Sequence, residues 1–170
     1  LPLAIPEERD TMIFSGTCVY DAKNTSGLGT TSHPPLVAIY TGHVEGKNQS
    51  QCVAYSNDEG IHWTKYPANP ILDLHKKDFR DPKVFWYEPL KYWVMALMYP
   101  VEHEVHFYSS DNLLRWKELS HFGPAGDTSG VWECPDLSRV PVENESGTYK
   151  WVLQTSQNAS MQYFVGEFNG

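Results

Sequence analysis

The sequence predicts an all-β fold, a β-propeller made of repeated four-stranded sheets, and three observations carry this prediction. Aromatic residues make up 14% of the chain beside 12 glycines and 12 prolines, a composition typical of short strands joined by tight turns. Almost no segment keeps an apolar period of 3.6 residues, so helices are not expected. Related segments also return after roughly fifty residues, which is the spacing of propeller blades.

The repeat is clearest between "CVAYSNDEGIHWTKY" and "VHFYSSDNLLRWKEL". Four residues of the first segment recur 53 positions later in the second: Tyr55, Ser56, Asp58 and Trp63 become Tyr108, Ser109, Asp111 and Trp116. The same offset places Arg80 over Glu133 and Pro82 over Pro135. A shared offset at several positions favours repeated blades over the alternative, an ordinary β-sandwich with accidental similarity.

Each unit is expected to contain the same strands in the same order. The first strands, "IFSGTCVYD", "RDPKVFWYE" and "ECPDLSRVP", are expected at 13–21, 80–88 and 133–141. The second strands, rich in apolar residues, are expected at 36–41, 92–98 and 149–155, and the third strands at 51–56, 104–109 and 161–168. The fourth strands, "HWTKY" and "RWKEL", carry the tryptophan, and the third unit stops before reaching this strand.

The segment between the third and fourth strands has the residues of a turn. In its Ser-x-Asp-x-x-x-x-Trp pattern, Asp58 or Asp111 is expected to accept hydrogen bonds from the amides of the turn. Trp63 or Trp116 then begins the outer strand and packs against the blade. Residues 1–170 thus cover about three blades. Because a propeller rarely closes with fewer than about four, we expect a segment of a larger propeller domain.

Composition excludes several classes of function. The formal charge of −8 and the lack of a Lys/Arg cluster argue against a nucleic-acid partner. The longest apolar stretch, at 92–99, is too short to span a bilayer, and the first residues show no signal peptide. The three cysteines, Cys18, Cys52 and Cys134, form no CxxC pair, and we expect them to be small buried residues.

The acidic residues at the starts of the first strands point to chemistry. Because inner strands line the channel of a propeller, Asp81 and Glu133 of neighbouring blades should converge on one axial cavity. Paired carboxylates suit glycoside hydrolysis, in which one donates a proton and the other carries charge. The neighbours of Glu133 are expected to raise its pKa by desolvation, and Arg80 to keep Asp81 ionised. In the structural alternatives, Asp81 is a turn residue before proline, and Glu133 is paired with a buried arginine.

At these residues the chain resembles glycoside hydrolase family 32, the β-fructosidases that include levanases, inulinases and invertases. The segments "FRDPKVFWYE" and "WECPDL" are similar to the family's Arg-Asp-Pro and Glu-Cys motifs, and "IFSGTCVYDAKNTSGLG" to its Phe-Ser-Gly segment. The resemblance, which extends to "MQYFVGEFNG" at the end of the chain, implies a five-bladed propeller. It also implies retaining hydrolysis of terminal β-D-fructofuranosides by a secreted or periplasmic enzyme, with no metal or organic cofactor.

The resemblance also implies roles for individual residues. Glu133 matches the general acid/base and Asp81 the stabiliser of the transition state, while Arg80, Phe14 and Ser15 match positions that bind the substrate. The family's nucleophile is an aspartate in an Asn-Asp-Pro-Asn motif on the first blade, and this motif does not occur in the sequence. We therefore expect the first blade to lie upstream of Leu1 and the chain alone to be inactive. Oligomeric state and preference among levan, inulin and sucrose stay open.

Two other functions fit parts of the sequence. "SNDEGIHW" matches a turn box of sialidases, but sialidases clamp a carboxylate with several arginines. Of the four arginines here, Arg9, Arg80, Arg115 and Arg139, only Arg80 lies at the start of an inner strand. A non-catalytic carbohydrate-binding propeller is the second alternative, because no nucleophile is present. A metal site at "VEHEVH" is not expected, because His103 and His106 of one strand point to opposite faces.

Overall fold

The computed structural model describes residues 3–8 and 10–170, and within them the chain forms eleven strands and no helix. The strands are β1 (Thr11–Tyr20), β2 (Leu36–Val44), β3 (Asn48–Ser56), β4 (Thr64–Lys65), β5 (Arg80–Tyr87), β6 (Tyr92–Tyr99), β7 (Glu104–Ser110), β8 (Lys117–Phe122), β9 (Glu133–Pro141), β10 (Tyr149–Gln157) and β11 (Ser160–Gly166). Every predicted strand is present, with ends displaced by no more than a few residues. No helix in this described part is long and apolar enough to cross a membrane.

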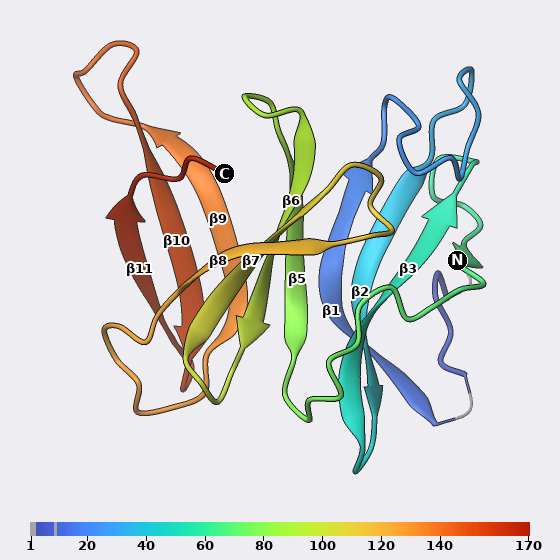
Figure 1. The fold of residues 1–170 in the computed structure, drawn as a ribbon, viewed down its shortest axis with the longest axis horizontal. Helices are drawn as coiled ribbons and strands as arrows, with labels where there is room; N and C mark the ends of the chain where they lie inside the picture. The colour runs from blue at the N-terminus through green and yellow to red at the C-terminus, as the bar shows by residue number, and fades with distance from the viewer. Residues whose placement is uncertain (1–2, 9) are drawn as a thin grey trace.

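The strands form three antiparallel sheets that follow the predicted repeat. Their orders are β1-β2-β3-β4, β5-β6-β7-β8 and β9-β10-β11, so each sheet is a meander that begins on its inner strand. The three sheets stand side by side (Figure 1), and β5 contacts β1 on one side and β9 on the other. The first strands therefore line a common surface, as expected for successive propeller blades.

The core lies between the sheets, which explains why the second strands read as apolar runs. In β6 seven of eight residues are buried because both faces of this strand are covered. Met95 and Leu97 face the first sheet, where they pack with Ile39. The alternate residues Ala96 and Met98 belong to a second cluster against the third sheet.

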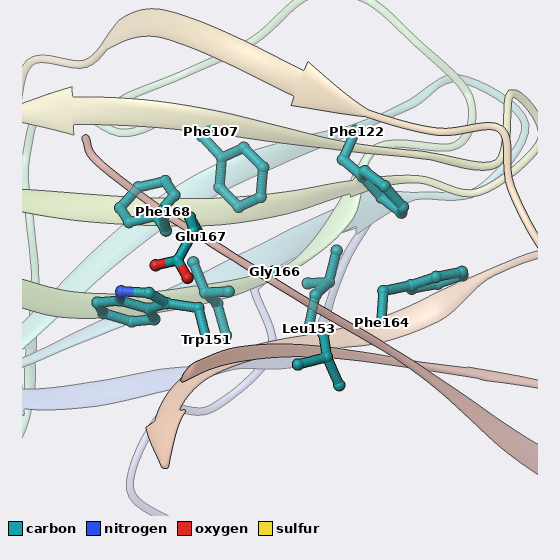
Figure 2. Close-up of a pocket in the computed structure, with 10 residues that line it drawn as sticks. Phe107, Phe122, Trp151, Leu153, Phe164, Gly166, Glu167 and Phe168 are labelled. Carbon is teal, nitrogen blue, oxygen red and sulfur yellow. The ribbon is translucent and has the colours of Figure 1, made fainter. Parts of the chain in front are cut away.

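A small cavity of about 220 Å³ remains between the second and third sheets. Figure 2 shows the aromatic side chains of Phe107, Phe122, Phe164 and Trp151 around it. Glu167 is its one ionisable lining residue, so this cavity lacks the carboxylate pair that hydrolysis needs. It belongs to the packing between blades.

The predicted turn occurs in both complete sheets, with one correction. In the first, Asp58 Oδ1 accepts the amide of His62 at 2.9 Å, and the Trp63 indole donates to Gly60. In the second, the accepting side chain is Asn112 and not Asp111. The turn has slipped by one residue relative to the sequence repeat, and Asn offers the same acceptor oxygen.

The expectation for the cysteines is only partly met. Cys52 is buried in the first sheet, whereas Cys18 and Cys134 are exposed. Both exposed cysteines lie on inner strands, and they line a cavity of about 410 Å³ along the shared surface. Inner strands face a channel and not a neighbouring sheet, so a small apolar residue there stays accessible.

Candidate active site

One open pocket gathers the five residues that the sequence analysis matched to catalysis or substrate binding, Phe14, Ser15, Arg80, Asp81 and Glu133. It has a volume of about 570 Å³ and lies where the three inner strands begin, with Ile13, Phe14, Ser15, Arg80, Asp81, Glu133 and Cys134 as its lining. Each of the three sheets contributes through its first strand. Asp81 and Glu133 thus share one cavity, as the repeat predicted.

A break in strand pairing positions the site residues in each inner strand. The register shifts between Ile13 and Gly16 in β1, between Arg80 and Lys83 in β5, and opposite Gln154–Ser156 in β9. A β-bulge of this kind redirects side chains away from the regular alternation. Asp81 has φ 63° and Cys134, at the same position of the next blade, has φ 49°. Left-handed backbone is uncommon for residues other than glycine, and here it accompanies the bulges of two successive inner strands.

Asp81 is the buried acid of the pocket, with 7% of its surface exposed. Its Oδ2 accepts the amide N–H of Cys134 at 2.9 Å, across to the neighbouring blade. Burial raises the pKa of Asp81, while this hydrogen bond and then the charge of Arg80 oppose the rise. Glu133 adds a smaller repulsive contribution that also raises the pKa of Asp81.

Glu133 is the exposed acid, with 46% of its side chain accessible. Its Oε1 accepts a hydrogen bond from Nη2 of Arg80 at 3.1 Å, and Arg80 also donates to Asp78 at 2.7 Å. The expected distribution of burial is therefore reversed. The Trp132 side chain lies in the apolar cluster of the second and third sheets instead of beside the Glu133 carboxylate. Arg80 forms its ion pairs with Asp78 and Glu133 and stays only a longer-range charge for Asp81.

Phe14 and Ser15 form the wall contributed by the first sheet. Phe14 is 37% exposed and stacks on His43 of β2, with ring centroids 4.6 Å apart. The next residue in the chain is Gly16, where the backbone of β2 is very close. A Cβ atom at this position would lie 2.1 Å from the carbonyl oxygen of Ile39. The Phe-Ser-Gly order thus presents an aromatic face and a hydroxyl to the pocket.

A buried polar network, which sequence reasoning missed, holds the start of β5 against the first sheet. Thr41 Oγ1 accepts the amide of Asp81 at 3.0 Å and donates to Gln51 Oε1 at 3.0 Å. Gln51 Nε2 donates to the Phe79 carbonyl at 2.7 Å, and Gln49 Oε1 accepts the Phe79 amide at 2.8 Å. The one available signal was a threonine at the end of the apolar run "PLVAIYT".

We expect Thr41→Val to destabilise the protein by about 1–3 kcal/mol, because the Asp81 amide is left without its acceptor. The thermal midpoint should fall by roughly 2–4 °C for each kcal/mol. Differential scanning calorimetry measures this change. Thr64→Val, at an exposed position of β4, is the matched control and should leave the midpoint unchanged. Equal midpoints for Thr41→Val and the parent would contradict the proposed role of the network.

The pocket lining distinguishes among the alternatives. Arg80 is its one arginine, while Arg115 is exposed and Arg139 stacks over Tyr149; Arg9 lies outside the described residues. A clamp of several arginines, which a sialidase needs, is therefore not formed by the described residues. His103 and His106 do not converge, since His103 contacts Gly130 and His106 contacts Glu104 and Glu118.

Comparison with known proteins finds sequence relatives along the whole chain. The model of the glycosyl hydrolases family 32 N-terminal domain matches residues 1–170. A levanase of Bacillus subtilis is 50% identical over 180 residues, which cover 100% of this chain and 26% of the levanase. The extracellular exo-inulinase of Aspergillus niger is 40% identical over 188 residues, covering 94% of this chain and 35% of that protein.

A solved structure is similar to this chain in fold. The crystal structure of exo-inulinase from Aspergillus awamori superposes with a TM-score of 0.90 at 38% identity, covering 96% of this chain and 37% of that one. This chain therefore spans about a third of the length of its relatives. With a family model that matches the whole sequence, and relatives this similar along almost all of it, the chain belongs to glycosyl hydrolase family 32.

Proposed function

We propose that this chain supplies the acid/base and the transition-state stabiliser of a β-fructosidase that hydrolyses terminal β-D-fructofuranosides with retention. The observation that carries the proposal is the convergence of Glu133 and Asp81, from adjacent inner strands, on one open pocket. The two carboxylates differ in burial and in partners, which is the condition for two carboxylates to take different roles.

Glu133 acts as the proton donor in this proposal. Its exposed carboxyl faces the pocket, so it is accessible to the oxygen of a leaving group. Arg80 holds the carboxylate through Oε1 and leaves the other oxygen without a partner among the hydrogen bonds of the described residues. The proton of this carboxyl passes to the oxygen of the leaving group as the glycosidic bond breaks. In the second half of the reaction the resulting carboxylate takes a proton from the attacking water.

Asp81 acts as fixed negative charge in this proposal. The amide of Cys134 donates to Oδ2, and Asp81 lines the pocket beside Arg80. A transition state with positive charge on the sugar ring is stabilised by such a preorganised group, whose orientation costs nothing during the reaction. Phe14 and Ser15 provide an apolar face and a hydroxyl for the fructosyl ring.

The substrate class is a fructan or sucrose. The names of the relatives, a levanase and an exo-inulinase, support a terminal fructosyl unit as the common feature. We further propose that the enzyme acts outside the cytoplasm, by secretion or in the periplasm, since the Aspergillus niger relative is extracellular. The formal charge of −8 disfavours a nucleic-acid partner.

A chimera tests the proposal directly. The segment of the Bacillus subtilis levanase that aligns with this chain is replaced by residues 1–170, and fructose release from levan is measured. We expect a folded chimera that hydrolyses levan. A folded chimera that binds levan but releases no fructose would instead support the carbohydrate-binding alternative.

The chain alone should be inactive. The sequence contains no Asn-Asp-Pro-Asn segment, and Asp81 follows arginine and belongs to the stabiliser motif. Incubation of the purified 170-residue chain with sucrose or levan should therefore give no fructose above the level of a heat-denatured sample. Measurable release would show that a nucleophile exists among these residues and would require a different assignment of roles.

A further inference from the structure

We propose that His106, Glu118 and His121, on the outer strands β7 and β8, form a binding site for a divalent transition metal of the zinc type. One donor atom from each of these residues lies within 4.8 Å of the donor atoms of the other two. Two imidazoles and one carboxylate are a common ligand set for zinc, with water completing the coordination. This site is separate from the pocket at the inner strands.

Strand register brings the three residues together. His106 and His121 are direct partners across the β7–β8 pair. Glu118 lies three residues before His121, so in a regular strand it would point to the opposite face. The register shifts here, with Phe107 opposite Ser120 but Tyr108 opposite Glu118, and this bulge restores Glu118 to the face of His121.

Each ring nitrogen of His106 has a carboxylate oxygen within hydrogen-bond distance. Its Nδ1 lies 2.7 Å from Glu118 Oε1, and its Nε2 lies 2.9 Å from Glu104 Oε2. A neutral imidazole has a single N–H, so it satisfies only one of these two carboxylates. The other nitrogen faces either a second proton or a metal ion. With zinc on Nδ1, the Nε2–H group donates to Glu104. A carboxylate is a common hydrogen-bond partner for the second ring nitrogen of a metal-bound histidine.

Burial and charge favour the same site. The His106 side chain is 11% exposed, and its ring is stacked between Tyr99, at 3.6 Å, and His121, at 5.0 Å. Carboxylates surround it, since Glu118 and Glu104 lie at its two ring nitrogens. Lys76, which pairs with Glu102, is the neighbouring cation over the Tyr99 ring. The negative potential attracts a dication.

The present contacts require a small rearrangement. Ligand atoms around a tetrahedral zinc ion lie roughly 3.4 Å apart, given bonds of about 2.0–2.2 Å. Glu118 must therefore move away from Nδ1, and its side chain is 51% exposed and free to turn. The His121 ring is exposed and stacks on His106, so it must turn to aim a nitrogen at the same ion. His106 is held in place by its stacking on Tyr99 and by Glu104. One rigid ligand and two adjustable ones allow a metal to enter from solvent.

Isothermal titration of the tag-free, metal-stripped protein with zinc chloride tests this proposal, with magnesium chloride as an oxygen-preferring control. We expect one zinc per chain and no binding of magnesium. His121→Ala should weaken zinc binding at least about tenfold, and Glu104→Gln should weaken it by roughly 10–100-fold. His75→Ala, at an exposed histidine beside Asp73, is the matched control and should bind as the parent does.

Two results would overturn the metal site. The first is the absence of saturable zinc binding by the parent. The second is unchanged affinity in His121→Ala, which would assign the metal to the thiols or to another surface. Thermal melts of each variant without metal establish that the variant is folded, and zinc should raise the melting temperature of the parent but not that of His121→Ala.

Discussion

In the levanase chimera, Glu133→Gln should lower turnover of levan by about two to four orders of magnitude, the range that general acid–base catalysis contributes. The glutamine side chain keeps the size of Glu133 and can still accept from Arg80, so the pocket should stay assembled. What is lost is the proton for the leaving oxygen. Steady-state kinetics with levan measure this loss.

The dependence on the leaving group distinguishes proton donation from a structural role. A fructoside with a good leaving group needs little protonation, so its first step should be affected much less than that of levan. Azide should restore part of the turnover of such an activated substrate, because it attacks the fructosyl enzyme without general-base assistance. Glu143→Gln, at an exposed position remote from the pocket, is the control. Near-normal hydrolysis of levan by Glu133→Gln would remove Glu133 from the role.

The repeat made the fold predictable because its evidence is local. Each strand carries its own pattern of β-branched and aromatic residues, and each turn its own Ser, Asp or Asn. The offset that joins Arg80 to Glu133 also places both at the start of an inner strand, which the structure confirms. The meeting of Asp81 and Glu133 in one pocket follows from that placement.

The burial of the Asp81 and Glu133 side chains was harder to predict, because it depends on the direction of the backbone at a single residue. From sequence, Glu133 sits between Trp132 and Cys134 and therefore looks desolvated. In the structure the register shift sends Trp132 into the core and Glu133 into the open pocket, while Asp81 turns into the blade interface. No sequence period reveals such a shift. The Thr41 network was missed for a related reason, since its partners Gln49, Gln51 and Phe79 meet only across two sheets.

Asp81→Asn should separate catalysis from stability. In the chimera, we expect kcat to fall by about two to three orders of magnitude, because the negative charge that stabilises the developing positive charge on the sugar ring is removed. The asparagine Oδ1 can still accept the amide of Cys134, and the backbone amide can still donate to Thr41. The fold should therefore persist. A variant that fails to fold would favour a purely structural role for Asp81.

The pH dependence of the melting temperature is a second measurement for Asp81→Asn. Burial raises the pKa of Asp81 in the folded state, so the folded state holds this proton more tightly than the unfolded state does. Stability contributed by Asp81 is then present at low pH and is lost as pH rises from the ordinary aspartate value, about 3.9, through the raised folded value. Asparagine does not titrate, so the melting temperature of the variant relative to the parent should be higher at pH 7 than at pH 4. A relative melting temperature that instead falls over this range would mean that the pocket stabilises the ionised carboxylate, with Arg80 and the Cys134 amide outweighing burial.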